Sequence, residues 1–453
     1  MRPLREIELV SAMRSVRFVT YGCKANQYDT QLLRETLRRR GWTEQREADL
    51  VVVNTCTVTA EAGRKARQLI RRIGRESPET RICVTGCLAE SEPEILRELP
   101  GVEWVLGNGE AKRPTHFLRQ LGEEVDPEEL GIPSGITEFA GHTRAFLKIQ
   151  DGCDKACAFC IIPRVRGRSR SKLANELVQE VRGLLENGFH EIVLCGIHIG
   201  HWGLDLGQNL AFLLRKLVEI EVLDQNGEER PWRLRLSSIE ATEVIPTAEG
   251  GDDVLSVMKD APHRIAPHLH MPLQSGDDAT LVAMNRWYTR KEYLAACDTI
   301  RERLDRPAFT ADVLVGFDGE TEARFQNTLR AVHEAGFARL HVFPFSPRPD
   351  TAAANPTALP SPSEVRDRRA RLSDAAAEVA TGYRESLSGA RETVVLEGWS
   401  GLSGRYQRVR LRPEDIEGVP PAMIEVELEL ADRGDGESEL FGRPLPQLEP
   451  ALR

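Results

Sequence analysis

Short apolar runs separated by amphipathic stretches occupy the first quarter of the chain. Continuous apolar segments of this length are typical of parallel strands buried on both faces. We expect the first helix between them to be capped by Asp29 or Thr30. The pattern predicts a parallel α/β sheet domain over residues 13–121, after a tail at 1–12. The strand-like runs are 16–20 (VRFVT), 50–54 (LVVVN) and 81–85 (RICVT).

The alternation of strand-like and helical segments resumes after residues 122–142. That stretch is acidic and rich in glycine and proline, which predicts a linker. Six repeated β/α units predict a (β/α)6 partial barrel over residues 143–388, with its chemistry at the C-terminal ends of the strands. The expected strands are 145–149, 190–195, 232–236, 267–271, 309–315 and 339–343.

The last part of the chain has a different pattern. Ser361 and Glu364 form a capping box with Pro362 between them, which predicts a helix running to about residue 388. Beyond it, short alternating runs are separated by Gly and Pro turns. This pattern predicts a small antiparallel β-barrel over residues 389–446.

Three cysteines of the first domain end similar phrases: VTYGC at Cys23, VVNTC at Cys56 and VTGC at Cys87. Each lies just past a predicted strand, and the C-terminal ends of parallel strands share one edge of the sheet. We therefore expect the three thiols to converge. Cys83 lies four residues before Cys87, about 13 Å back along the strand, and we expect it to be a packing residue. Cys195 and Cys297 are likewise expected to be structural.

A second trio, Cys153, Cys157 and Cys160, lies in one loop after the first strand of the expected barrel. Structural zinc sites and iron–sulfur clusters usually take four protein ligands. Three thiols without a nearby fourth cysteine or histidine leave one coordination position open, which indicates a catalytic rather than a structural metal site. His268 and His270 share one face of a predicted strand, and we expect pocket or core roles for both.

Composition limits the remaining choices. The chain has 453 residues, nine cysteines and a formal net charge of −10. An odd cysteine count without a secretion signal argues against a disulfide framework, so the cytoplasm is the expected location. No apolar run approaches the roughly 18 residues of a membrane span. The net acidity is only a weak argument against nucleic acid, because binding depends on local patches.

The spacing C-x3-C-x-aromatic-C, with Phe159 as the aromatic residue, resembles that of the radical S-adenosylmethionine (SAM) enzymes. In those enzymes the open iron of a [4Fe-4S] cluster chelates SAM and splits it to a 5′-deoxyadenosyl radical. CGIHIG, SIEA, PLQSG and VLVGFDGETE resemble the later segments that line the SAM pocket. The resemblance implies these SAM-pocket residues: Phe159, Gly196, Ser238, Gln274, Ser275 and Gly316.

From residue 16 to about 445 the chain resembles the methylthiotransferases. The resemblance implies a second [4Fe-4S] cluster held by Cys23, Cys56 and Cys87, the radical cluster on the second trio, and two SAM molecules per turnover. It also implies a C-terminal TRAM-like RNA-binding module. GCKANQYDT and NTCTVT, together with SIEA at residues 238–241 and CGIHIG, resemble the branch that modifies N6-threonylcarbamoyladenosine 37 of tRNA at C2.

Alternative functions remain open at this point. One is a methylthiotransferase acting on N6-isopentenyladenosine 37 or on ribosomal protein S12. The other, from a different class, is a non-catalytic iron–sulfur protein that binds RNA. Intact cysteine trios count against the second alternative, because a binding module has no use for open iron sites.

The distribution of arginines fits a tRNA partner. Arginine binds phosphate in a bidentate manner, which positions RNA without reading its sequence. A basic helix near residues 64–75 adds to this charge, whereas the acidic stretch 414–439 fits tRNA poorly. We also expect a flavodoxin or ferredoxin as electron donor, no membrane partner and a monomer. The expected RNA-binding residues are Arg164, Arg166, Arg168, Arg408, Arg410 and Arg412.

Overall fold

The computed structural model describes residues 14–57, 60–125, 135–224, 226–246, 251–416, 418–432 and 438–445. It separates into two compact units. The first unit ends at Ile136 and includes Arg164–Arg166, and the second contains the rest of the chain. The expected tail 1–12 lies outside the described residues, as do parts of the linker 122–142 and of the acidic stretch 414–439. Among the described residues, no helix has the length and apolarity needed to cross a membrane.

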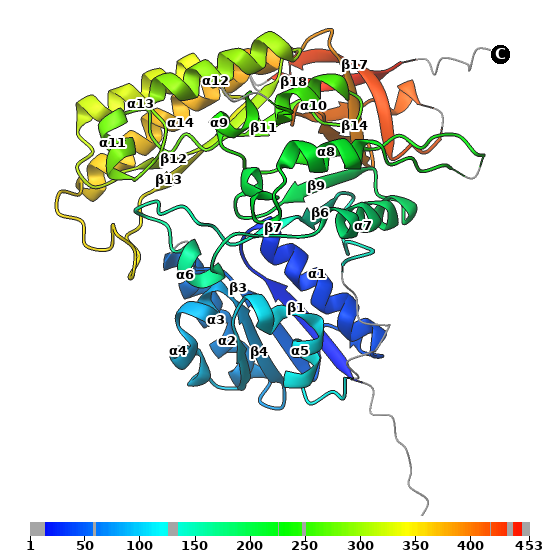
Figure 1. Ribbon diagram of the computed structural model, residues 1–453, viewed down its shortest axis with the longest axis vertical. Helices are drawn as coiled ribbons and strands as arrows, with labels where there is room; N and C mark the ends of the chain where they lie inside the picture. The colour runs from blue at the N-terminus through cyan, green and yellow to red at the C-terminus, as the bar shows by residue number, and fades with distance from the viewer. Residues whose placement is uncertain are drawn as a thin grey trace, which may run out of the picture. The chain divides into compact units, whose positions relative to one another are not determined.

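The first unit is built on a parallel sheet, as predicted, with β2 and β5 in addition to the three expected strands (Figure 1). The strand order is β2-β1-β3-β4-β5, and every neighbouring pair is parallel. The strands are β1 (Ser15–Thr20), β2 (Thr43–Glu44), β3 (Leu50–Thr55), β4 (Arg81–Gly86) and β5 (Val102–Leu106). The helices are α1 (Lys24–Arg39), α2 (Ala60–Glu76), α3 (Cys87–Ser91), α4 (Pro93–Arg97) and α5 (Pro114–Gln120).

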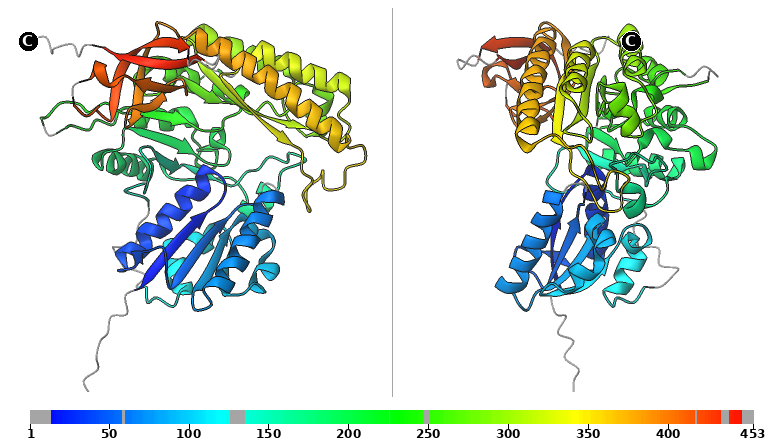
Figure 2. Two further views of the ribbon diagram at one scale, coloured as in Figure 1. Left: turned by 180° about the vertical axis from the view of Figure 1, so that it is seen from behind. Right: turned by 90° about the vertical axis from the view of Figure 1, so that its left-hand side faces the viewer.

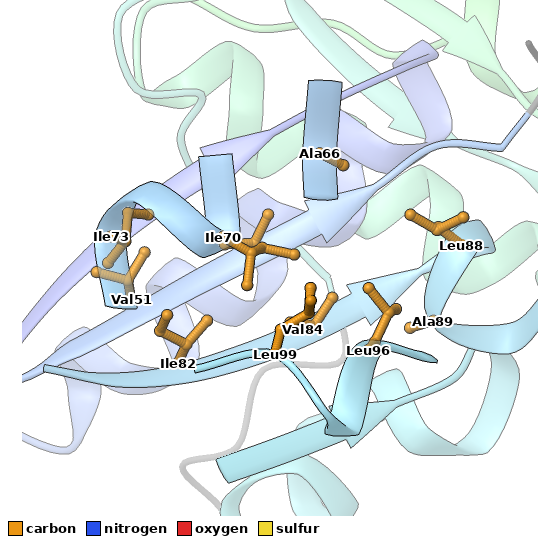
Figure 3. Packing of buried hydrophobic residues seen from close by; sticks show 11 residues of the cluster. Val51, Ala66, Ile70, Ile73, Ile82, Val84, Leu88, Ala89, Leu96 and Leu99 are labelled. Atoms are coloured by element: carbon orange, nitrogen blue, oxygen red, sulfur yellow. The ribbon is translucent and has the colours of Figure 1, made fainter. Parts of the chain in front are cut away.

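Apolar side chains fill both faces of this sheet. On one face, Ile70 of α2 and Leu96 of α4 pack against Ile82 and Val84 of β4 (Figure 3). Cys83 belongs to the cluster on the opposite face, together with residues of α1 and α5. Burial on both faces explains why the strands are continuously apolar rather than alternating.

The expected helix cap at Asp29 or Thr30 is wrong, because α1 begins at Lys24 with Cys23 as its N-cap. Asp29 therefore lies inside the helix, where it is buried. Its Oδ2 accepts a hydrogen bond from Lys112 Nζ at 2.9 Å and contacts Arg166 Nη2 at 3.4 Å, all within the first unit. A buried carboxylate needs such partners to offset the loss of hydration.

The second unit contains six parallel strands at the predicted places. They form two three-stranded sheets, in the orders β6-β9-β10 and β11-β12-β13. Parallel bridges from Leu234 to Ile265 and from Ser238 to His270 join the two sheets. This is the expected (β/α)6 partial barrel. The strands are β6 (Ala145–Lys148), β9 (Glu191–Cys195), β10 (Arg233–Leu236), β11 (His268–His270), β12 (Ala308–Val315) and β13 (Arg339–Pro344).

Helices cover the outside of this barrel. In Figure 2, α12, α13 and α14 run together along the β11–β13 half. Ser361 and Glu364 make the predicted capping box, which starts the long helix α14. The main helices are α7 (Ala174–Glu186), α8 (Leu210–Val218), α10 (Val254–Asp260), α11 (Asp278–Ala283), α12 (Arg290–Arg303), α13 (Glu322–Ala335) and α14 (Pro362–Glu385), with the short α6 (Ile162–Arg166) and α9 (Ala241–Val244).

The C-terminal strands close into a small barrel in the order β14-β15-β16-β18-β17. Its pairs are antiparallel except β16 with β18, which is parallel. Val394, Val409 and Val426 are among the residues of its core. The strands are β14 (Arg391–Glu397), β15 (Ser400–Ser403), β16 (Arg408–Leu411), β17 (Met423–Asp432) and β18 (Ser438–Pro444).

A buried ion network links the two barrels of the second unit. The carboxylate of Glu191, at the start of β9, accepts hydrogen bonds from Arg233 Nε at 2.7 Å and from Arg235 Nε and Nη2 at 2.9 Å. Burial alone would raise the pKa of Glu191, but the guanidiniums of Arg235 and Arg233 outweigh it and hold that pKa well below its usual range. The remaining guanidinium N–H groups donate to carbonyls of the C-terminal barrel at Thr393, Leu402, Ser403 and Gly404.

Replacing Glu191 tests this network. Glu191→Gln should lower the free energy of unfolding by about 3–5 kcal/mol, because two buried guanidiniums would lose their counter-charge. Asp252→Asn removes a carboxylate from the exposed pair with Arg215 and should cost less than about 1 kcal/mol. Urea unfolding of the full chain measures both, and equal midpoints for the two variants would contradict the assigned role of the network.

Candidate cluster and SAM site

The strand register brings the first cysteine trio to one edge of the first unit's sheet. Thr55 of β3 lies opposite Gly86 of β4, so Cys56 and Cys87 leave the sheet side by side. Gly22 lies directly against Cys56, since a Cβ on it would stand 2.8 Å from Cys56 Cβ and 3.0 Å from its Sγ. With φ of +98°, Gly22 has a backbone conformation that favours glycine. Cys23, the next residue, therefore starts α1 beside Cys56.

Two asparagines that the sequence did not single out hold these loops in place. Asn26 Nδ2 donates to the carbonyls of Tyr21 (2.8 Å) and Thr55 (2.9 Å), which join the loops carrying Cys23 and Cys56. Asn54 Nδ2 donates back to the carbonyl of Asn26 at 2.8 Å. Both amides are fully buried, and buried polar side chains are usually hydrogen-bonded in this way.

The trio and the control cysteine differ in their surroundings. Cys23 is exposed at the N-terminus of a 16-residue helix. Cys83 is fully buried inside β4, and burial raises the pKa of its thiol to about 12. Cys83 is thus a packing residue, as expected, and Cys195 and Cys297 are also buried.

The second trio occupies the loop between the short strand β7 (Gln150–Asp151) and α6, and its thiols are partly buried. Burial is the main cause that raises the pKa of Cys153, and it raises that of Cys160 to about 12. Thiolates in such a place require a bound cation. Donors already point at two sulfurs: the Lys155 amide at Cys153 Sγ (3.4 Å) and Arg286 Nη1 at Cys157 Sγ (3.3 Å). This donor set fits the thiolates of an iron–sulfur cluster.

Gln150, which the sequence also did not single out, joins the cluster loop to the CGIHIG segment. Its Oε1 accepts from the amides of Ile197 (3.1 Å) and His198 (2.9 Å), while its Nε2 donates to the Gly152 carbonyl at 2.7 Å. Gly196 packs against it, since a Cβ there would stand 2.8 Å from the Gln150 carbonyl oxygen. The close approach requires glycine at residue 196.

The other residues expected in the SAM pocket separate into two groups. Phe159, Ser238 and Gln274 are half-buried, so their side chains remain partly accessible. Ser275 is buried, and its Oγ contacts Thr328 Oγ1 at 3.4 Å. Gly316 makes a turn with φ of +83°, and a Cβ there would strike Val365 at 2.7 Å. These two residues shape turns at the ends of β11 and β12.

A cluster of polar side chains, centred on Arg286, lies beside the second trio. Arg286 Nη2 donates to Glu240 Oε2 (2.5 Å) and to Tyr288 Oη (3.1 Å), and the Tyr288 hydroxyl donates to the carbonyl of Pro272 (2.8 Å). Lys155 Nζ stands 4.1 Å from the ring centroid of Trp287. These residues come from loops after several different strands, so spacing in the sequence carried no signal for them.

His198, His201 and Glu243 form a hydrogen-bonded triad near Cys153. His198 Nε2 lies 2.8 Å from Glu243 Oε1, His201 Nε2 lies 3.4 Å from the same oxygen, and His198 Nδ1 lies 3.6 Å from Cys153 Sγ. Ligand atoms of the three residues fall within 4.8 Å of one another. The two imidazoles are stacked at 3.8 Å with planes 17° apart, so they share one carboxylate rather than approaching an ion from tetrahedral directions.

The arginines expected to bind RNA have unequal surroundings. Arg164 and Arg168 are exposed. Arg166 is buried in the first unit, where it donates to Asn26 Oδ1, so its assignment to an exposed basic patch is wrong. A sequence run cannot reveal that the middle arginine points into a core.

The three arginines at the end of β16 and just beyond it also differ. Arg410 Nε pairs with Glu439 at 2.7 Å, and Arg412 Nη1 pairs with Glu429 at 2.8 Å. Arg408 is exposed and donates instead to the hydroxyl of Ser400 at 3.2 Å. Acidic residues of β17 and β18 thus neutralise part of this basic strand.

Comparison with known proteins identifies the class first. The radical SAM superfamily matches residues 147–332, which hold the partial barrel and its three-cysteine loop, and uncharacterized protein family UPF0004 matches residues 15–107. The radical SAM methyltransferase TsrM from Kitasatospora setae has a similar fold, with a TM-score of 0.55 at 16% identity over 76% of this chain and 77% of that chain. Fold and site therefore define a radical SAM protein.

Curated relatives then identify the family. The chain is 38% identical to the threonylcarbamoyladenosine tRNA methylthiotransferase MtaB of Bacillus subtilis (strain 168) over 76% of each chain. It is 34% identical to the Thermotoga maritima protein of that name over 86% of this chain and 88% of that one. A tRNA-2-methylthio-N(6)-dimethylallyladenosine synthase of Cereibacter sphaeroides is 35% identical over 80% of this chain and 82% of that protein. The chain belongs to the methylthiotransferase family of radical SAM enzymes.

Cys87 is expected to bind a cluster and Cys83 is not, so alanine variants of these two cysteines should differ in iron content. After anaerobic reconstitution the intact chain should hold about eight irons, in two four-iron clusters. Cys87→Ala should lower the content to about four, whereas Cys83→Ala, four residues away, should retain about eight. Iron and acid-labile sulfide assays measure this. A full complement in Cys87→Ala, or an equal loss in both variants, would remove Cys87 from the ligand set.

Proposed function

We propose that the protein is a tRNA methylthiotransferase that inserts a methylthio group at C2 of N6-threonylcarbamoyladenosine 37, near the anticodon. The observation that carries this proposal is the first trio of cysteines, Cys23, Cys56 and Cys87, at the strand-end edge of the first unit's parallel sheet. A radical SAM enzyme that only cleaves SAM needs one open iron site. A sulfur-inserting enzyme needs another site from which sulfur is delivered, and Cys23, Cys56 and Cys87 are suited to hold it.

The target carbon explains the need for radical chemistry. An aromatic C–H carbon offers neither a leaving group nor useful acidity, so a general base has little to act on. The bound clusters and two SAM molecules per turnover would supply the radical, the sulfur and the methyl group, and the protein would orient them. Cys153, Cys157 and Cys160 would hold the radical cluster, and Gln150 and Gly196 would keep the SAM-binding loop against it.

The assignment of the substrate depends on short sequence segments rather than on overall identity. Identities of 38% and 34% to threonylcarbamoyladenosine enzymes overlap the 35% to a dimethylallyladenosine enzyme, so overall identity separates the branches poorly. GCKANQYDT, NTCTVT and SIEA favour the threonylcarbamoyl branch. The dimethylallyl (isopentenyl) substrate is the second candidate because of that 35% relative.

A tRNA partner is supported by the relatives and by exposed cations. Arg164, Arg168 and Arg408 are exposed and could contact phosphates. Such an enzyme would work in the cytoplasm, as a monomer, with a flavodoxin or ferredoxin as electron donor. The two three-cysteine sites argue against a non-catalytic iron–sulfur RNA-binding protein, since a binding module has no use for open iron positions.

The two substrate branches can be separated directly. The reconstituted enzyme should add a methylthio group to tRNA carrying N6-threonylcarbamoyladenosine 37 and leave tRNA carrying N6-isopentenyladenosine 37 unchanged. Nucleoside mass spectrometry of both tRNAs, with tRNA lacking either modification as control, measures the products. Methylthiolation of the isopentenyl tRNA alone would reassign the branch, and modification of neither would refute the proposed function.

Because glutamates neutralise some of the arginines of β16, replacing different arginines should weaken tRNA binding to different extents. Arg408→Ala should weaken binding and reduce the slope of log K against log salt by about 1, because one free phosphate contact is lost. Arg410→Ala should change the slope less, since Glu439 already compensates that charge. Filter binding over a salt series measures both variants. Equal slopes for Arg408→Ala and the unaltered chain would show that this strand does not contact tRNA.

A further inference from the structure

The turn between β15 and β16, residues 403–407, lies against the N-terminal ends of the radical SAM barrel strands. Its carbonyls at Ser403 and Gly404 accept hydrogen bonds from Arg235 of β10 at 2.8 and 2.9 Å. A Cβ on Gly404 would stand 3.3 Å from Pro267, immediately before β11. The turn therefore covers the mouth of the barrel opposite to the strand ends that carry the cysteine loop.

A second residue of the turn fixes it on another strand. Arg405 Nη2 donates to the carbonyl of Asp305 at 2.8 Å and to its carboxylate at 2.9 Å, and Arg405 Nε donates to the Arg306 carbonyl at 2.9 Å. These acceptors immediately precede β12. With Arg235 and Pro267, the turn thus contacts three neighbouring strand starts, as a cover over a barrel mouth must.

Tyr406 is the last residue of a three-residue hairpin loop, closed by hydrogen bonds from Ser403 N–H to the Gln407 carbonyl at 2.9 Å and from Tyr406 N–H to the Ser403 carbonyl at 3.1 Å, and this position of such a loop is left-handed. Its φ is +60°, in the left-handed region that tyrosine enters only at a cost in free energy. Its ring stacks on His268 of β11, with centroids 4.4 Å apart and planes 12° apart. The guanidinium of Arg235 lies over the same ring, 5.4 Å from its centroid. The hairpin thus sets the backbone of Tyr406, and the ring contacts fix its side chain on His268 and Arg235.

A hydrogen-bonded ladder continues from His268 along the concave face of β11 and β12. Thr310 Oγ1 lies 3.0 Å from His268 Nε2 and 2.9 Å from His270 Nδ1. Because the hydroxyl has one proton, it donates to at most one of the two imidazoles and accepts a hydrogen bond from at least one of them. His270 Nε2 in turn lies 3.4 Å from Asp312 Oδ2. The orientation of His270 is thus linked through Thr310 to the ring that Tyr406 supports.

Exposure changes along this ladder. Glu191, Arg235 and His268 are buried at the level of the turn. The side chains of His270 and Asp312, nearer the C-terminal ends of the strands, are 19% and 33% exposed. The barrel interior is therefore closed at the end where the turn lies and open at the end where the chemistry of such barrels takes place.

We propose that the turn 403–407 is the floor of the radical SAM chamber, with Tyr406 as a positioning residue that seals the chamber and orients the His268–Thr310–His270–Asp312 ladder. The C-terminal barrel is then a structural part of the reaction chamber, beyond any contact it makes with RNA. This role goes beyond the proposed function. The proposal predicts that the ring of Tyr406, and not the backbone of the turn, keeps water out of the barrel interior next to the turn.

Three variants of one residue test this role in the full chain. Tyr406→Gly removes the ring and relieves the left-handed backbone, so the turn and the fold are retained. Tyr406→Phe keeps the ring and loses only the hydroxyl. Tyr406→Asn removes the ring but keeps a residue that tolerates φ above zero, which controls for the backbone effect of glycine.

Two measurements give the outcome. Hydrogen exchange followed by mass spectrometry should show amides of 266–271 and 308–312 exchanging about tenfold faster in the glycine and asparagine variants, and at the normal rate in the phenylalanine variant. In reconstituted enzyme, the ratio of 5′-deoxyadenosine to methylthiolated nucleoside should rise severalfold in the same two variants, because SAM cleavage becomes uncoupled from product formation. A merely structural contact would lower both products together and leave their ratio unchanged.

Unchanged exchange in Tyr406→Gly, or a normal product ratio beside faster exchange, would overturn the proposal. The exchange measurement does not need the methylthiotransferase reaction. If the unaltered enzyme modified no tRNA, the proposed function would fail, while faster exchange in the two ring-deleted variants would still support a sealed floor.

Discussion

The polarity of parallel strands is the constraint on which both cysteine trios depend. All strands of a parallel sheet end at one edge, so a residue placed after each strand meets its counterparts there. In the first unit this rule brings together cysteines 33 and 31 residues apart in the chain, with Thr55 opposite Gly86 as the register that matters. In the second unit the same rule places the cysteine loop, the CGIHIG loop and Gln274 at the strand ends of the barrel.

Desolvation then decides which buried side chains can stay ionised. The raised pKa values of Cys153 and Cys160 mean that free thiolates are disfavoured in this loop, so a bound cluster and hydrogen-bond donors are needed to stabilise them. Elsewhere in the second unit, Glu191 remains ionised because Arg233 and Arg235 surround it. Barrel interiors are usually filled by branched apolar residues, and this charged layer is possible because the C-terminal barrel supplies carbonyl acceptors.

The C-terminal barrel therefore has two faces with different roles. Its turn at residues 403–407 and strand β14 accept hydrogen bonds from the buried arginines of the radical SAM barrel. Its strand β16 carries arginines that neighbouring glutamates partly neutralise, which leaves Arg408 without such compensation. Removal of this barrel would take away the carbonyl acceptors of Arg233 and Arg235, whose hydrogen bonds to Glu191 lie within the larger domain.

The sequence by itself determined the parallel sheet, the six barrel strands, the long capped helix and the separation of Cys83 from the trio, because these follow from local hydrophobic periodicity and strand polarity. Only the tertiary structure decided that α1 starts at Lys24 with Cys23 as its N-cap, that Asp29 and Arg166 are buried, and that Gln150, Arg286 and Tyr406 reach the chamber. Their partners lie between 46 and 140 residues away along the chain. Pairing over such distances depends on how elements pack, and no local pattern of residues records it.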